Sequence, residues 1–168
     1  MLLWFAGTAL IAMWFTFRDP AIDHRLVILG ALLPDVLDMF LRDSKFMHTI
    51  AAPILLLTLF MVGTIGRRQL RRHALAIPIG VFWHLVFDGA WMNTDLFWWP
   101  LTSVANGDMN SSLFEREVYL IVCMELVGLV LLVWSWRLMG MNDASRRRLF
   151  VGSGRLDRQL IESKTKGL

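Results

Sequence analysis

The stretch ALAIPIGVFWHLVFDGAWM, residues 74–92, is apolar along almost its whole length, yet it contains one histidine and one aspartate, His84 and Asp88. An apolar run of this length is typical of a membrane-spanning helix. Ionisable side chains inside such helices are costly and usually mark function. This one stretch therefore predicts a helical membrane protein with a polar site inside it.

Four other apolar stretches indicate the same class of protein. They cover residues 2–17, 26–41, 46–66 and 118–140. Apolar and aromatic residues make up 56% of the chain and charged residues 18%, whereas soluble domains have about a quarter charged. The sequence predicts an all-α, integral membrane helical bundle of about five transmembrane helices in residues 1–140, followed by a basic cytoplasmic tail at 141–168.

Two of these stretches allow another interpretation. The second is short and contains Pro34, so it could be a broken or re-entrant helix inside the bundle. The first could be a signal peptide, but no basic residue precedes it and no small-residue cleavage pattern follows it. We therefore expect it to be a membrane helix.

Basic residues predict the orientation of the chain. Arginines at positions 67, 68, 71 and 72 fill one short loop, and the segment after Arg137 is also rich in arginine and lysine. Such residues favour the cytoplasmic side, which places the N-terminus and the loop at 93–117 outside and the C-terminus in the cytoplasm of a multi-pass cell-membrane protein. Membrane lipids are the expected partners, since a basic tail is attracted to anionic lipid. No motif predicts binding to nucleic acid, and the sequence names no partner protein.

Six ionisable residues lie within the predicted spans: Asp35, Asp38, His48, His84, Asp88 and Glu125. Asp35 and Asp38 are three residues apart, and His84 and Asp88 are four residues apart. Each pair therefore shares one face of a helix. Counted from the span ends, all six fall in the outer half of the membrane. We therefore expect one shared site, and we expect His24 and His73, which fall in loops, to be surface residues.

Either internal ion pairing or a bound cation could compensate these charges. Four carboxylates against two histidines, with no lysine or arginine inside the spans, favour a cation. The chain has a single cysteine, Cys123, which excludes a metal site built from several thiolate ligands. Histidine and carboxylate ligands suit a divalent metal ion, and we expect zinc, with manganese or iron as alternatives.

Two further features have alternative interpretations. Glu125 could support the site as a general base or partner of a ligand, or it could be a lone protonated carboxyl. Trp98 and Trp99 could shape the mouth of the site or belong to an aromatic belt at the membrane interface.

Four sequence elements together resemble the family of predicted membrane-bound metal-dependent hydrolases. These elements are GALLPDVLD at 30–38, HT at 48–49, GVFWHLVFD at 80–88 and FWWPL at 97–101. The resemblance covers about residues 29–101. It implies a metal-binding set of Asp35, Asp38, His48, His84 and Asp88.

The first functional hypothesis is a membrane-embedded hydrolase that acts on phosphoester or lipid-linked substrates through a metal-activated water. Asp38 and Glu125 are then the candidate catalytic residues, as base or as partner of a metal ligand. A second hypothesis is a non-enzymatic metal-binding subunit or transport component of the membrane. A third is a structural protein whose polar contacts are satisfied internally, so the sequence leaves open whether the protein is an enzyme.

Overall fold

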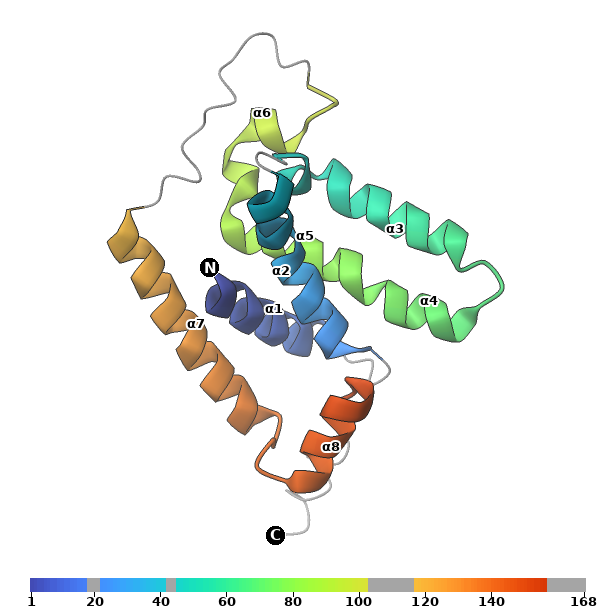
Figure 1. Cartoon of the computed structure of the whole chain (residues 1–168), viewed down its shortest axis with the longest axis vertical. Coiled ribbons are helices and arrows are strands. Elements are labelled where there is room, and N and C mark those ends of the chain that lie inside the picture. The colour runs from blue at the N-terminus through green and yellow to red at the C-terminus, as the bar shows by residue number, and fades with distance from the viewer. Residues whose placement is uncertain (18–21, 42–44, 103–116, 157–168) are drawn as a thin grey trace.

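The computed structural model describes residues 1–17, 22–41, 45–102 and 117–156. These residues form helices and no strand (Figure 1), which confirms the all-α class. The elements in order are α1 (Leu2–Thr16), α2 (His24–Leu41), the 3-10 turn η1 (Lys45–His48), α3 (Ala51–Gly63), α4 (Arg68–Ala74), α5 (Ala76–Asp88), the 3-10 turn η2 (Ala90–Met92), α6 (Thr94–Phe97), α7 (Val118–Leu138) and α8 (Ala144–Ser153).

The structure does not support the predicted bundle of five transmembrane helices. Each of the five apolar stretches contains a helix, but among the described residues only α7 is both long and apolar enough to cross a membrane. Its 21 residues span about 31 Å, which matches a hydrocarbon layer about 30 Å thick. Helices α1 and α3 are apolar but have only 15 and 13 residues. The predicted multi-pass topology and its orientation are likewise unsupported.

The helices are shorter than the apolar stretches that contain them, for local reasons that hydropathy does not register. The stretch 46–66 begins with η1, and its helix α3 starts only at Ala51. The stretch 74–92 is interrupted after Asp88, because Gly89 adopts a left-handed backbone (φ 75°) and ends α5. Leu75, between α4 and α5, keeps helical backbone angles, so these two helices follow one another almost without a break.

Two pairs of glycines let the central helices approach each other at backbone distance. A Cβ atom at Gly80 of α5 would lie 2.2 Å from the carbonyl oxygen of Val27 in α2, and one at Gly30 would lie 2.2 Å from that of Ile77. Gly7 and Gly128 form a similar contact between α1 and α7. Small residues at such crossings are typical of helix packing in membranes. The α2–α5 crossing brings the two helices that carry most of the predicted site together.

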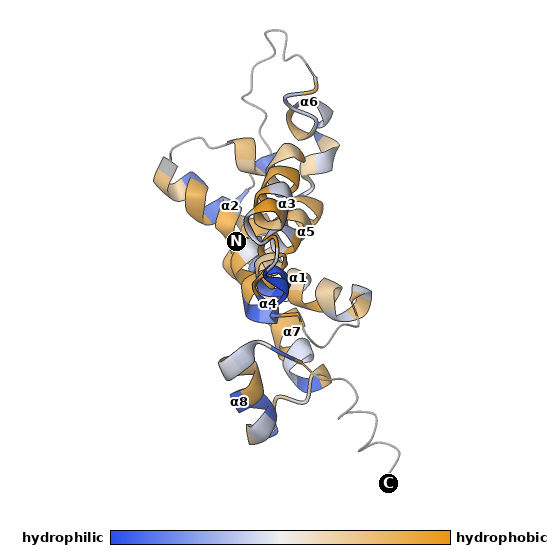
Figure 2. Ribbon diagram, turned by 90° about the vertical axis from the view of Figure 1, so that its right-hand side faces the viewer, coloured by the Kyte–Doolittle hydropathy of each residue, from blue (hydrophilic) through white to orange (hydrophobic). Residues whose placement is uncertain are grey.

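The side-chain core lies where α1, α2 and α5 meet, around Phe5, Met13 and Val27. A second cluster joins α1 to the C-terminal segment, since Met141 and Leu156 are buried with Trp14. The part of the predicted tail at 141–156 is therefore packed against the bundle, and 157–168 lies outside the described residues. Apolar colour covers most of the bundle helices in Figure 2, and α4 and α8 are the most hydrophilic.

Polar contacts fix the end of α8 to the start of α2. The backbone N–H of His24 donates to the carbonyl oxygen of Gly154 at 2.9 Å. Arg25 forms an ion pair of 2.8 Å with the buried carboxylate of Asp23. Burial alone would raise the pKa of Asp23, but the hydrogen bonds and charge of Arg25 outweigh it and hold that pKa below its ordinary value. His24 is itself buried, so its predicted surface location is wrong.

His73, the other histidine predicted to lie at the surface, is half-buried on α4. Its Nδ1 atom lies 2.8 Å from the carbonyl oxygen of Gln69, one turn earlier in the same helix. This histidine is therefore engaged locally and lies outside the central packing.

The glycine crossing can be tested by adding one methyl group. We expect Gly80→Ala to lower the free energy of unfolding by about 1–3 kcal/mol, because α2 and α5 must move apart. Gly63→Ala is the matched control, since a Cβ there meets no atom within 4 Å. Thermal unfolding in detergent, followed by circular dichroism, measures both. Equal melting temperatures for the two variants would contradict the packing described.

The ion pair at the α8–α2 junction predicts a pH dependence. Because the folded-state pKa of Asp23 lies below the ordinary value of 3.8, its stabilisation is complete above that pH and is lost as the pH falls through the folded value. The melting temperatures of wild type and Asp23→Asn should therefore differ most near neutral pH and converge in acid. A difference that stays constant with pH would show that the Asp23 charge contributes nothing.

Candidate metal centre

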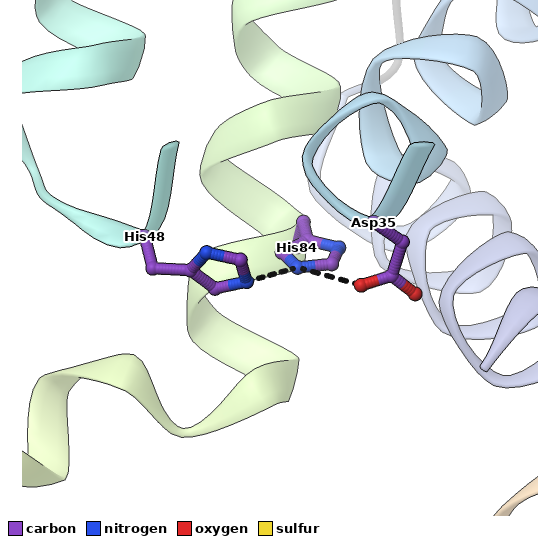
Figure 3. A group of neighbouring side chains, drawn as sticks. All are labelled: Asp35, His48 and His84. Atoms are coloured by element: carbon purple, nitrogen blue, oxygen red, sulfur yellow. Dashed lines mark hydrogen bonds and ion pairs between the residues drawn. The ribbon is translucent and has the colours of Figure 1, made fainter. Parts of the chain in front are cut away.

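Three side chains from three elements converge at the centre of the bundle. Asp35 comes from α2, His48 from η1 and His84 from α5 (Figure 3). One potential ligand atom of each lies within 4.8 Å of the others. The Nε2 atom of His84 is 3.4 Å from Nε2 of His48 and 3.7 Å from Oδ1 of Asp35. This group could hold a metal ion.

The orientation of His84 is fixed by the α2–α5 crossing. Gly80 lies one turn before His84 and permits the close approach of α2. As a result, the Nδ1 atom of His84 lies 2.7 Å from the carbonyl oxygen of Ala31. The ring of Phe5 from α1 covers the imidazole, with the ring centroids 3.9 Å apart. The imidazole is thus buried and held on two sides.

His48 is held by the end of η1 and by the FWWPL element. The hydroxyl of Thr49 donates to the carbonyl oxygen of Phe46 at 2.8 Å and closes the turn. The backbone N–H of Ile50 donates to the carbonyl oxygen of Phe97 at 2.9 Å. The ring of Trp99 packs edge-on against Phe46, with the centroids 6.1 Å apart. This element therefore supports the backbone on both sides of His48.

The partners of the two Nδ1 atoms bear on what the two Nε2 atoms can do. A carbonyl oxygen only accepts hydrogen bonds, so the proton of a neutral His84 lies on Nδ1. The Nδ1 atom of His48 lies 3.5 Å from Oδ2 of Asp38, which is an ion-pair distance and does not by itself fix the tautomer of the ring. The two Nε2 atoms lie 3.4 Å apart, a distance that either a hydrogen bond between the rings or a shared cation can bridge.

Asp35 supplies the third potential ligand atom from the last part of α2. Its Oδ1 atom faces His84, and its Oδ2 atom accepts a hydrogen bond of 3.1 Å from the amino group of Met1. Pro34 precedes it and has no N–H, so the helix lacks one backbone hydrogen bond at this point. The carboxylate is half-buried, while both histidines are fully buried.

The spacing of the nitrogen atoms matches a tetrahedral metal site. Two ligands at zinc distances of about 2.0–2.1 Å, separated by the tetrahedral angle, lie about 3.3 Å apart. The two Nε2 atoms are 3.4 Å apart. Histidines that bind metals usually donate their other ring N–H to a carbonyl or a carboxylate. Each histidine here has one such acceptor next to Nδ1, Ala31 for one and Asp38 for the other.

The other predicted site residues lie outside this three-residue group. Asp38 contacts the far side of the His48 ring. Asp88 is buried at the last position of α5, one turn after His84. Glu125 of α7 accepts a hydrogen bond of 2.9 Å from the backbone N–H of Leu3, and so satisfies a free N–H in the first turn of α1.

Two contributors to the site were not predicted from the sequence. The carbonyl oxygen of Ala31 is a backbone atom, and nothing in the residue type indicates its role. Phe5 is one of many apolar residues in α1, and its contact with His84 depends on tertiary packing. Gly30 and Gly80 are the sequence signals for the close crossing of α2 and α5.

The chain matches no protein-family model, no curated protein sequence and no solved structure. Function therefore has to be inferred from the residues of the site and their geometry.

The geometry predicts a graded effect of substitutions on metal content. Purified wild type should contain stoichiometric metal by elemental analysis, and Asp35→Ala, His48→Ala and His84→Ala should lose it. Asp38→Asn should retain the site with about 10–100-fold weaker affinity, because Asp38 acts through His48. His73→Ala is the control, since the Nδ1 atom of His73 contacts the carbonyl oxygen of Gln69 in its own helix α4, and it should keep full metal content. Equal metal loss in all five variants would contradict the assignment.

Proposed function

We propose that the protein is a membrane-bound metal-dependent hydrolase whose metal ion is held by Asp35, His48 and His84. The observation that carries the proposal is the convergence of the two Nε2 atoms and one carboxylate oxygen. Zinc is the proposed ion, with manganese or iron as alternatives, because the ligands are nitrogen and oxygen without sulfur. The resemblance of the four sequence elements to membrane-bound metal-dependent hydrolases supports the same conclusion.

The number of protein ligands favours catalysis over a purely structural metal. Structural zinc sites usually have four protein ligands, whereas catalytic sites have three and leave a position open. Three side chains form the group in the described part of the chain. A bound divalent cation would supply Lewis-acid chemistry and activate water for attack on an ester. The reaction would consume one ester and one water and release an acid and an alcohol.

The remaining polar residues would serve this chemistry in different ways. Asp38 lies 3.5 Å from Nδ1 of His48 and would orient that ring, so it acts as a positioning residue. Ala31 does the same for His84 through its carbonyl oxygen. Half-buried Asp35, the more accessible ligand, marks the side from which a substrate would approach. Metal binding by Asp88 and a catalytic role for Glu125 stay predictions from the sequence.

A location within the membrane fits the distribution of apolar side chains. Helix α7 can span a membrane by length and composition, and most of its residues are exposed. Large apolar side chains are also exposed along α3, among them Leu55, Leu59 and Val62. Exposed apolar surface on this scale is typical of contact with lipid or with another protein. We propose that the shorter apolar helices are embedded beside α7, with the N-terminus outside and the C-terminus in the cytoplasm.

Hydrolysis of a soluble chromogenic phosphodiester, bis(p-nitrophenyl) phosphate, tests the proposed activity. Purified protein should release nitrophenol, a chelator should abolish the release, and added zinc should restore it. His84→Ala should be inactive because it lacks a ligand. His73→Ala is the matched control. His73 lies on α4, and its Nδ1 atom contacts the carbonyl oxygen of Gln69 in the same helix.

Two outcomes would count against a hydrolase. Activity that survives in both His84→Ala and His48→Ala would place the chemistry elsewhere in the chain. A full metal complement without hydrolysis of any ester would favour the alternative function, a non-enzymatic metal-binding subunit of the membrane.

A further inference from the structure

A basic pocket lies on α4, away from the metal centre. Its volume is about 450 Å³, and its lining consists of three arginines and one glutamine, Arg68, Arg71, Arg72 and Gln69. Helices α4 and α5 follow one another almost without a break, so the stretch from Arg72 to His84 corresponds to about 18 Å at about 1.5 Å per residue. The pocket is therefore separate from the candidate metal centre.

The protein does not neutralise the charge of this pocket. A fourth arginine, Arg67, directly precedes it, and residues 46–87 contain no aspartate or glutamate. No carboxylate in the described part of the chain forms an ion pair with any of the four arginines. The Nε atom of Arg71 is buried and has no hydrogen-bond partner. These arginines are therefore available to an anion from outside the chain.

The spacing of the arginines suits a phosphate group. Arg71 and Arg72 follow Arg68 by three and four residues, so all three share one face of α4. Each guanidinium donates hydrogen bonds in a planar fork that matches the oxygen atoms of a phosphate. The side-chain amide of Gln69 can donate to the same group. A negatively charged phosphate group is the ligand that fits this lining.

Exposed apolar side chains next to the pocket favour a lipid over a soluble phosphate. Ile65, in the turn before α4, is 73% exposed, and Val62, in the last turn of α3, is 62% exposed. Leu70 lies between the arginines on α4 and is also exposed. Basic side chains beside apolar surface match a membrane interface, where phosphate groups lie next to hydrocarbon chains. A phospholipid can contact both kinds of side chain, whereas a phosphate ion can contact only the arginines.

We propose that the α4 pocket binds the phosphate group of an anionic phospholipid at the membrane surface, while the hydrocarbon chains of that lipid contact the apolar side chains beside it. The lack of any carboxylate partner for the arginines carries the proposal. The site is distinct from the metal centre and does not depend on the hydrolase function.

Lipid retention by the immobilised full-length protein in detergent tests the pocket. The probe is phosphatidylglycerol with a fluorescent label on one acyl chain, and wild type should bind it more tightly than phosphatidylcholine with the same label. The double variant Arg71→Gln and Arg72→Gln should bind it about 25-fold more weakly, because each arginine near an anionic membrane surface contributes about fivefold. The double variant Arg148→Gln and Arg155→Gln is the matched control. It removes the same charge from exposed positions outside the pocket and should bind like wild type.

A second pair of substitutions guards against misfolding of the first. Arg68→Gln combined with Arg72→Gln removes the same charge from the pocket and should weaken binding to the same extent. A melting temperature equal to that of wild type shows that each variant is folded. Unchanged binding in both pocket variants would overturn the proposal. Equal weakening in the matched control would also overturn it, because attraction to charge anywhere on the protein would then explain the binding.

Competition with inorganic phosphate distinguishes a lipid from a soluble ligand. Sodium chloride at the same ionic strength is the control for screening of the charges. We expect phosphate to displace no more phosphatidylglycerol than sodium chloride does, because the phosphate ion lacks the hydrocarbon chains. Displacement by phosphate alone would indicate a site for soluble phosphate and would overturn the assignment to a lipid.

Discussion

The hydrogen bond between the Nδ1 atom of His84 and the carbonyl oxygen of Ala31, 2.7 Å long, connects the packing of the bundle to its candidate chemistry. It can form only if α2 and α5 touch at backbone distance, which Gly30 and Gly80 permit. A wider crossing would leave a buried imidazole N–H without an acceptor, at a cost of about 1–3 kcal/mol. The same hydrogen bond leaves Nε2 of His84 free for a ligand.

The second histidine is constrained in a parallel way from another part of the chain. Asp38 lies on the Nδ1 side of His48, and the backbone around η1 is held by Phe97. The Nε2 atoms of the two rings therefore lie 3.4 Å apart, although His48 comes from η1 and His84 from α5. Two buried imidazole nitrogens and a half-buried carboxylate gathered in one place are ligands of the kind that a divalent metal ion binds. This convergence is the physical reason to propose a metal centre here.

Much of the site follows from the sequence, because it depends on spacing along helices and on the excess of carboxylates. The sequence predicts one shared site of six residues, and the structure brings three of them, Asp35, His48 and His84, into one group. Contacts to the backbone could not be predicted in this way. Glu125 accepts a hydrogen bond from the backbone N–H of Leu3, and the backbone N–H of His24 donates to the carbonyl oxygen of Gly154. Because almost every residue has these backbone atoms, the residue types do not indicate such contacts. Only one of the five predicted spans is supported by its helix length, in part because hydropathy does not register a left-handed glycine such as Gly89, which ends α5.

X-ray absorption at the zinc edge of the reconstituted, zinc-loaded protein would identify the ligands around the metal. We expect two imidazole ligands with zinc–nitrogen distances of about 2.0–2.1 Å, together with oxygen ligands. One imidazole should be lost in His48→Ala and one in His84→Ala. A spectrum with only oxygen scatterers, or one unchanged by both substitutions, would show that the two histidines do not bind the metal.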